Sequence, residues 1–320
     1  MADPGPGEVL SARNPAVRFV ADLVRHAQAR STARRFVVEG PKLVELAISS
    51  GRRVDWVFFD SPDSYERFGV LARLAVRTGA RLGIVAPGVM KRISGTVSPQ
   101  GVLAVTEMVE ASLADLPASG FVLVCVDVAD PGNLGTAIRG AAAAGADGAV
   151  VCDGCVDAYN PKAVRASAGA LLQFRVITKV PAGPALTRLA DLGYRRVGAV
   201  ARGGVAYDEA DFAGPLAFVA GGESRGIPVE VSSLLDCEVT IPMVQGAESL
   251  NVAMAATVLC FEAARRRRLG SNARRESELT VGKDLGRRAG KVEPDRSKVT
   301  GQVLPGLAHG NGDLDRRLMI

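Results

Sequence analysis

Histidine is nearly absent from this sequence. The 320 residues contain two, His26 and His309, one near each end, and the stretch from about residue 115 to 268 contains none. A Ser–His–Asp triad, a histidine-ligated metal and a histidine general base all need this side chain. We therefore exclude those three chemistries from the central part of the protein.

Long apolar runs are also missing. No stretch of about 18 apolar residues occurs, so the sequence predicts no membrane-spanning helix. The first residues, MADPGPGEVLSARNP, lack the apolar core of a secretory signal peptide. We expect a cytoplasmic protein that does not bind a membrane.

Cysteine and aromatic residues are few. Five cysteines, an odd number, cannot form a disulfide framework in a chain of this length, which favours a reducing compartment. Cys152 and Cys155 form a C-x-x-C pair. A zinc site needs four ligands and no histidine lies nearby, so we interpret both as buried or loop thiols and predict no metal. Aromatic residues make up 5% while glycine contributes 36 residues, a composition typical of closely packed α/β enzymes.

The net charge is mildly positive. Lys and Arg number 39 against 34 Asp and Glu, a balance of +5 that fits a polyanionic partner without requiring one. The candidate basic surface consists of Arg25, Arg30, Arg34, Arg35 and Lys42. A solvated helix face explains these residues nearly as well.

The hydrophobic pattern predicts a small α/β domain over residues 1–113. We expect its first dozen residues, rich in Pro and Gly, to be irregular. Apolar periodicity then predicts helices near 16–30, 41–51, 64–78 and 89–93. Strands are predicted near 36–38, 54–59, 82–85 and 101–109.

A second α/β domain is predicted over residues 118–268, after a linker that contains Pro117. Strands are expected near 121–127, 148–152, 174–179, 196–200, 216–220 and 237–241. Helices are expected near 134–144, 161–170, 184–192 and 249–268. Near-continuous apolar strands that alternate with helices indicate a doubly wound parallel sheet. Residues 269–320 contain no aromatic residue, and we expect this tail to be largely disordered.

Three strand ends carry polar or glycine-rich stretches, and ligands of an open parallel sheet bind beyond such ends. After Asp127 comes Asp-Pro-Gly-Asn133, with Asn133 placed to cap the next helix and Arg139 within it. The strand near 218 opens into a turn whose glycines permit close approach to a ligand. The strand ending at Ile241 leads to Ser249, a candidate N-cap, and to Asn251.

The second stretch also matches another motif. Gly222-Glu-Ser224-Arg-Gly226 reads G-x-S-x-G, the nucleophile-elbow pattern of α/β-hydrolases. Such an enzyme needs a downstream histidine, and the one available, His309, lies in the predicted tail. We therefore interpret the match as accidental.

The three stretches, in this order and spacing, resemble the SpoU (TrmH-type) family of RNA ribose 2′-O-methyltransferases. Asp-Pro-Gly-Asn133-Leu-Gly with Arg139 is similar to the first family motif, and Gly221-Gly-Glu223-Ser-Arg-Gly226 to the second. Ile241-Pro-Met243 with Ser249-Leu-Asn251 is similar to the third. Two N-terminal segments, Phe36-Val-Val-Glu39-Gly-Pro and Ser98-Pro-Gln100-Gly, resemble the ribosomal-protein-like RNA-binding domain of rRNA-directed members. This branch includes the thiostrepton-resistance methyltransferase.

The resemblance implies a fold, a cofactor and a site. The fold is a parallel-sheet domain with a deep trefoil knot, preceded by the small α/β RNA-binding domain, and the protein is a homodimer. The cofactor is S-adenosyl-L-methionine, contacted by Gly221, Ile241 and Leu250. The catalytic region consists of Asn133, Arg139, Glu223, Ser249 and Asn251. Gly222 departs from the family pattern, because many members carry Asn there.

The implied reaction is 2′-O-methylation of a ribose, most naturally in 23S rRNA. An arginine holds its proton up to a pKa above about 12, so Arg139 is a poor base. We expect it to bind a substrate phosphate and to lower the pKa of the hydroxyl group through its charge. A tRNA-directed methyltransferase and a catalytically idle RNA-binding or ribosome-assembly protein remain alternatives.

Overall fold

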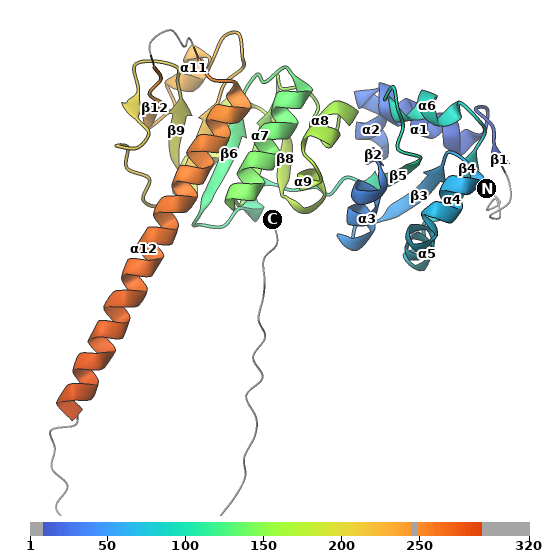
Figure 1. Cartoon of the computed structure of the whole chain (residues 1–320). Coiled ribbons are helices and arrows are strands. Elements are labelled where there is room, and N and C mark those ends of the chain that lie inside the picture. Colours follow the sequence, from blue (N-terminus) through green and yellow to red (C-terminus); the bar gives the residue numbers. More distant parts are fainter. Residues whose placement is uncertain (1–8, 245–248, 290–320) are drawn as a thin grey trace, which may run out of the picture. The chain divides into compact units, whose positions relative to one another are not determined.

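The computed structural model describes residues 9–244 and 249–289, with side chains described as far as Gly270. The described residues divide into two units, one ending at Gly270 and the other beginning at Ser271. The first unit contains two sheets, and the predicted α/β class is confirmed (Figure 1). No helix in the described part of the chain is long and apolar enough to cross a bilayer.

The N-terminal sheet has five strands in the order β1-β4-β3-β5-β2. Its strands are β1 (Val9–Leu10), β2 (Arg35–Glu39), β3 (Val54–Phe59), β4 (Arg81–Val85) and β5 (Val102–Glu107). β1, β4 and β3 are parallel, while β5 runs antiparallel to both β3 and β2.

Helices cover both faces of this sheet because successive strand residues point to opposite sides. One face packs against α1 (Pro15–Arg25) and α6 (Val89–Ser94), with Val37 and Phe58 in the same apolar cluster. The other face packs against α3 (Pro41–Ser49) and α5 (Gly69–Arg77), with Val38 and Phe59 in that cluster. Two short helices, α2 (Ala27–Ala33) and α4 (Pro62–Arg67), complete this N-terminal lobe, residues 9–109.

The second sheet has seven parallel strands in the order β10-β12-β9-β11-β6-β7-β8. Its strands are β6 (Phe121–Cys125), β7 (Gly148–Cys152), β8 (Val176–Val180), β9 (Arg195–Ala199), β10 (Val205–Ala206), β11 (Leu216–Ala220) and β12 (Cys237–Thr240). Every residue of β6, β7 and β11 is buried, as their apolar sequences predict.

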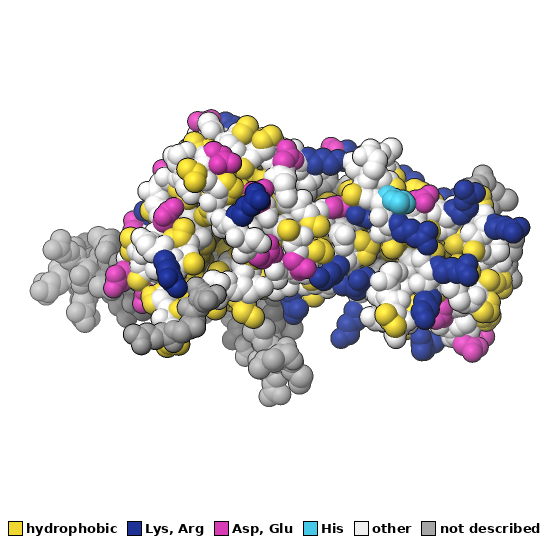
Figure 2. Space-filling model, turned by 90° about the horizontal axis from the view of Figure 1, so that it is seen from above, with side chains coloured by type: hydrophobic (Ala, Val, Ile, Leu, Met, Phe, Trp, Pro, Cys, Tyr) yellow, Lys and Arg dark blue, Asp and Glu magenta, His cyan; other side chains and the backbone are white. Residues whose placement is uncertain are grey.

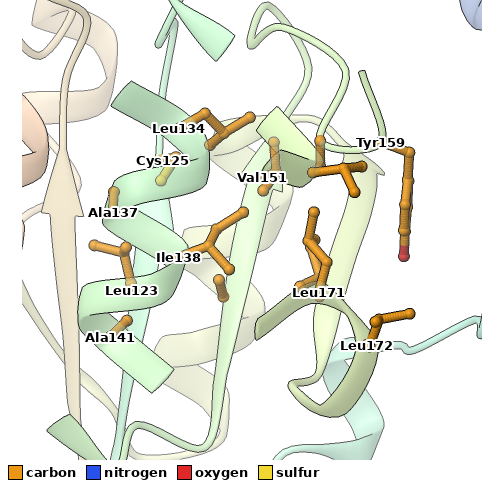
Figure 3. Packing of buried hydrophobic residues seen from close by; sticks show 14 of the residues in the cluster. Leu123, Cys125, Leu134, Ala137, Ile138, Ala141, Val151, Tyr159, Leu171 and Leu172 are labelled. Carbon is orange, nitrogen blue, oxygen red and sulfur yellow. The ribbon is translucent and has the colours of Figure 1, made fainter. Parts of the chain in front are cut away.

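The helices of this part are α7 (Pro131–Ala144), α8 (Pro161–Ala166), α9 (Ala170–Gln173), α10 (Ala182–Asp191), α11 (Val229–Ser232) and α12 (Val252–Ala289), with a 3-10 turn η1 (Leu113–Asp115) before them. Figure 3 shows the packing of α7 on the sheet, where Ile138 lies between Leu123 of β6 and Val151 of β7. α7 also lies directly on α8, because a Cβ at Gly135 would stand 2.3 Å from the Ala163 carbonyl oxygen.

The structure corrects several predicted boundaries. The helix expected at 16–30 divides at His26, whose backbone is extended, and the helix at 64–78 divides at Phe68. The helix at 161–170 divides into α8 and α9. β1 was expected to be irregular, and its two residues form a strand only through pairing with β4. α12 begins at Val252 and continues to Ala289, so part of the tail that was expected to be disordered is helical.

Contacts between distant segments join the two sheets within the first unit. The Arg30 guanidinium group donates from Nε to Asp157 Oδ2 at 2.7 Å. Arg52 donates from Nε to the Leu172 carbonyl oxygen at 2.7 Å. The rings of Phe36 and Tyr159 lie 4.9 Å apart. The resemblance also implies a deep trefoil knot, and residues 245–248 of the chain path lie outside the described residues.

Candidate active site

A cavity of about 360 Å³ lies at the carboxyl ends of β9, β11 and β12. Its lining includes all three residues predicted to contact a cofactor, Gly221, Ile241 and Leu250. Glu223, Ser249 and Asn251 line it as well. The second and third of the predicted stretches therefore meet at one edge of the sheet, as parallel strands require.

The turn after β11 needs glycine because the backbone is crowded there. A Cβ at Gly221 would stand 2.2 Å from the carbonyl carbon of Gly226. A Cβ at Gly222 would stand 2.4 Å from the carbonyl oxygen of Asp127, so the turn as it stands here has no room for a larger residue at that position. The Gly226 amide donates to the Gly222 carbonyl oxygen at 2.9 Å, so residues 222–226 form a tight turn.

Three predicted site residues form one hydrogen-bonded chain beside the cavity. Asn133 Nδ2 donates to Glu223 Oε1 at 2.8 Å, and Asn251 Nδ2 donates to Asn133 Oδ1 at 2.8 Å. Because an ionised carboxylate only accepts hydrogen bonds, it fixes the orientation of the Asn133 amide, which in turn fixes that of Asn251. These two hydrogen bonds link the first, second and third motifs directly.

The same geometry corrects two predicted helix caps. Asp130, not Asn133, is the N-cap of α7, and its side chain accepts from the Asn133 amide at 2.9 Å. Asn251, not Ser249, caps α12, because Asn251 Oδ1 accepts from the Ala253 amide at 2.9 Å. The side chain of Asn133 is therefore free to bridge, and that of Ser249 is free to face the cavity.

Opposing influences set the pKa of Glu223. Burial pushes the pKa of this carboxyl group up, but hydrogen bonds from Asn133 and from backbone amides, including that of Ala129, lower it below its ordinary value. Glu223 is consequently ionised at neutral pH. Both oxygens already accept hydrogen bonds, Oε1 from Asn133 and Oε2 from the Ala129 amide at 3.3 Å.

Arg139 stands apart from this group. It is exposed on α7, six residues and about 9 Å along the helix axis from Asn133, and it does not line the cavity. Within the described residues its guanidinium group has no hydrogen bond or ion pair. An exposed cation at this distance is available to an external anion.

Part of the cavity wall lies outside the site residues predicted from the sequence. Ala199, Val200 and Ala201 line it at the end of β9, and Met243 lines it after β12. The strand predicted at 196–200 ends at the same edge of the sheet, and this position could have indicated that the residues after it line the cavity. Small apolar residues after a strand, however, carry no chemical signature.

The G-x-S-x-G and C-x-x-C matches found in the sequence both have structural explanations. Ser224 is exposed at the tip of the 222–226 turn, and the one histidine among the described residues, His26, belongs to the N-terminal lobe. The thiol group of Cys155 donates to the Cys125 carbonyl oxygen at 3.2 Å. Burial raises the pKa of Cys152 to about 12 and that of Cys155 to about 11, so both thiols are protonated at neutral pH.

Comparison with known proteins identifies both parts of the chain. Residues 120–261 match the SpoU rRNA Methylase family, and residues 14–104 match the MRM3-like substrate binding domain. The chain is 30% identical over 271 residues to a 23S rRNA (uridine(2479)-2′-O)-methyltransferase of Streptomyces viridochromogenes, covering 82% of this chain and 94% of that protein. It is 30% identical over 255 residues to RlmP of Bacillus subtilis, a 23S rRNA (guanosine(2553)-2′-O)-methyltransferase, covering 79% of this chain and 98% of that protein.

Solved structures agree. The crystal structure of an AdoMet-bound rRNA methyltransferase from Sinorhizobium meliloti matches with a TM-score of 0.72 and 28% identity, covering 81% of this chain and 98% of that one. The two family matches follow each other in the order of the two sheets, and the full-length relatives share both parts. The chain belongs to the SpoU rRNA methylase family.

Proposed function

We propose that this protein transfers the methyl group of S-adenosylmethionine to a ribose 2′-hydroxyl group of 23S rRNA. The observation that carries the proposal is the Glu223–Asn133–Asn251 chain of hydrogen bonds beside the cavity. It joins the three family motifs at the strand ends where a ligand binds. The relatives described above, which act on 23S rRNA at a ribose, support the choice of substrate.

The cavity suits S-adenosylmethionine. Gly221 lies in the cavity wall at a turn too crowded for a Cβ, and Ile241 and Leu250 supply apolar parts of the wall. We assign cofactor binding to these three residues. When bound, the cofactor supplies an electrophilic sulfonium methyl group, and the protein's task is to align a ribose hydroxyl with it.

The residues of the site divide this task. The bridge from Glu223 to Asn251 holds the loops after β6, β11 and β12 in register, and Ser249 orients the ribose from the cavity wall. Glu223 is a weak base, because its pKa is lowered and both oxygens are occupied. Arg139, exposed and unpaired within the described residues, binds the substrate phosphate, and its charge lowers the pKa of the nearby hydroxyl group.

We further propose a homodimer. Met254 and Phe261 stand seven residues apart on α12, hence on one face, and are 61% and 44% exposed. An apolar stripe of this kind is typical of an interface helix. α12 also lies close to α7, because a Cβ at Gly140 would stand 2.1 Å from Thr257 Oγ1, so a partner on α12 would lie near the catalytic region.

The domain assignment follows the same reasoning. Residues 1–113 bind the RNA substrate, residues 118–268 carry the methyltransferase site, and no role is assigned to residues 269–320. A cytoplasmic location stays a prediction.

Methyl transfer from labelled S-adenosylmethionine to unmodified 23S rRNA, 16S rRNA and tRNA, measured in parallel, tests the proposal. One position of 23S rRNA should become resistant to alkaline cleavage, since 2′-O-methylation blocks that reaction. Asn133→Ala should lose the activity, and Ser224→Ala, at the tip of the same turn as Glu223, should keep it and should resist labelling by a fluorophosphonate. Label in tRNA alone would establish the tRNA alternative. Cofactor binding without transfer to RNA or to ribosomal particles would favour the idle RNA-binding alternative.

A further inference from the structure

Charge is distributed unevenly between the two lobes of the first unit. Residues 9–109 contain 15 Lys and Arg against eight Asp and Glu, whereas residues 120–268 contain 14 against 15. The lobe that carries the cavity is therefore close to neutral, while the N-terminal lobe carries an excess of positive charge that attracts a polyanion. Electrostatic attraction of RNA within the first unit comes mainly from the N-terminal lobe.

Most basic residues of the predicted surface are already paired. Arg30 is 2% exposed and bonded to Asp157, and Arg35 Nε donates to Asp55 Oδ2 at 2.5 Å. Arg34 forms an ion pair with Glu110. Arg30 and Arg35 are largely buried in ion pairs and so do not belong to the surface expected from the sequence, whereas Arg34 is exposed but paired with an exposed acid.

A different set is exposed and unpaired. The α1–α6 basic face consists of Arg13, Arg18, Arg25, Lys91 and Arg92. Within the described residues none of these side chains has a hydrogen bond or an ion pair. A single acid, Asp22, is exposed among them on α1.

The five residues belong to one surface. α1 and α6 share an apolar cluster beneath, in which Val20 of α1 and Ile93 of α6 are both buried. The loop that follows α6 also contacts α1, because a Cβ at Gly95 would stand 3.2 Å from Val24. Arg18 and Arg25 are seven residues apart, which places them on one side of α1 about 10 Å from each other. Figure 2 shows Lys and Arg side chains gathered over this half of the molecule.

The opposite face of the lobe does not have this character. Its helices α3, α4 and α5 carry exposed bases, but Glu45, Asp63 and Glu66 are exposed between them. Neighbouring positive and negative side chains largely cancel each other's potential at a phosphate backbone, and salt screens what remains within about 8–10 Å. Among the described residues, the α1–α6 side has five exposed, unpaired bases against one exposed acid, Asp22, and so offers the stronger positive field.

We infer that the α1–α6 basic face binds the phosphate backbone of the substrate RNA, an inference that rests on the proposed function. The substrate-binding match covers residues 14–104 and so contains four of the five residues. Phosphate contacts fix the position of a nucleic acid without reading its sequence. The face therefore supplies affinity and register, while the cavity lobe selects the nucleotide.

The test compares two triple variants that remove the same charge. Arg18→Gln, Arg25→Gln and Arg92→Gln neutralise the face. Arg73→Gln, Arg77→Gln and Arg188→Gln remove three exposed, unpaired arginines from α5 and α10. Binding to in vitro-transcribed 23S rRNA is measured from about 50 to 300 mM salt, together with KM, kcat and S-adenosylmethionine affinity.

Each neutralised phosphate contact contributes about 0.7–0.9 to the slope of log K against log salt. The first variant should lower that slope by about two to three and raise the KM for RNA roughly 100-fold near 100 mM salt. Its kcat at saturating RNA and its cofactor affinity should stay unchanged, which a misfolded protein would not show. The control variant should change the slope little. An unchanged slope in the first variant, or an equal loss in both, overturns the inference while the wild-type protein still methylates RNA. Absence of methylation by the wild-type protein counts against the proposed function itself.

Discussion

Replacing Arg30 by Ala should destabilise the protein without acting through RNA. The guanidinium group is 3% exposed and donates to Asp157 and, at 2.6 Å, to the Leu23 carbonyl oxygen. Removing one partner of a buried ion pair costs about 3–5 kcal/mol. The Asp157 side chain is 26% exposed and regains some hydration, so we expect the lower end, about 3 kcal/mol. The Tm should fall by about 5–10 °C.

Arg25→Ala is the matched control, five residues earlier and exposed. A surface substitution of this kind changes stability by about 0.5 kcal/mol or less. Urea unfolding followed by circular dichroism measures both variants. If Arg30→Ala loses less than about 1 kcal/mol, or no more than Arg25→Ala, the assignment of Arg30 to the junction between the lobes is refuted.

Three further predictions follow from the site and the core. Gly221→Ala introduces a Cβ 2.2 Å from the Gly226 backbone, an overlap that costs about 1–3 kcal/mol. The Kd for S-adenosylmethionine, measured by calorimetry, should therefore rise roughly 10–100-fold. The control Gly69→Ala, where α5 has room for a Cβ, should bind the cofactor normally, and normal binding by both variants would contradict the crowding argument. Asn133→Ala should lower kcat by about 100-fold with little change in cofactor affinity, and a loss confined to cofactor binding would disprove its bridging role. Burial raises the pKa of Cys155 to about 11 and that of Cys260 to about 12, so the contribution of these thiols to the free energy of unfolding should be constant below about pH 8.5 and should fall as the pH rises toward 11. A rise in the free energy of unfolding between about pH 8 and 10 in urea titrations would be inconsistent with buried thiols.

The fold was largely readable from the sequence because its signals are local. Apolar runs such as residues 121–125 mark buried parallel strands, and the glycine-rich turn after residue 220 marks the edge where a ligand binds. The elements missed are those that local sequence does not determine. β1 has two residues and exists through its partner β4, and His26 interrupts a periodic helix by its backbone conformation alone.

Side-chain roles were harder to predict because they depend on partners far along the chain. Arg25 and Arg30 look equivalent in sequence, yet the partner of Arg30 lies 127 residues away. The run Arg265–Arg268 suggests a basic patch, but Arg266 and Arg267 bind carbonyl oxygens of Ala210 and Gly214. Asn133 was selected as a cap and instead bridges two motifs, because Asp130 already caps the helix.

The position of β6 has a consequence for synthesis of the chain. β6 lies between β7 and β11, and residues 126–215 separate its end from the start of β11. At a translation rate of about 5–20 residues per second, the ribosome needs roughly 5–18 s to supply that neighbour. During this interval one edge of a wholly apolar strand has no partner, a state that favours pairing with other chains. The nascent methyltransferase domain is therefore most prone to aggregation just before residue 216 emerges, and slow codons in the preceding stretch would prolong that exposure.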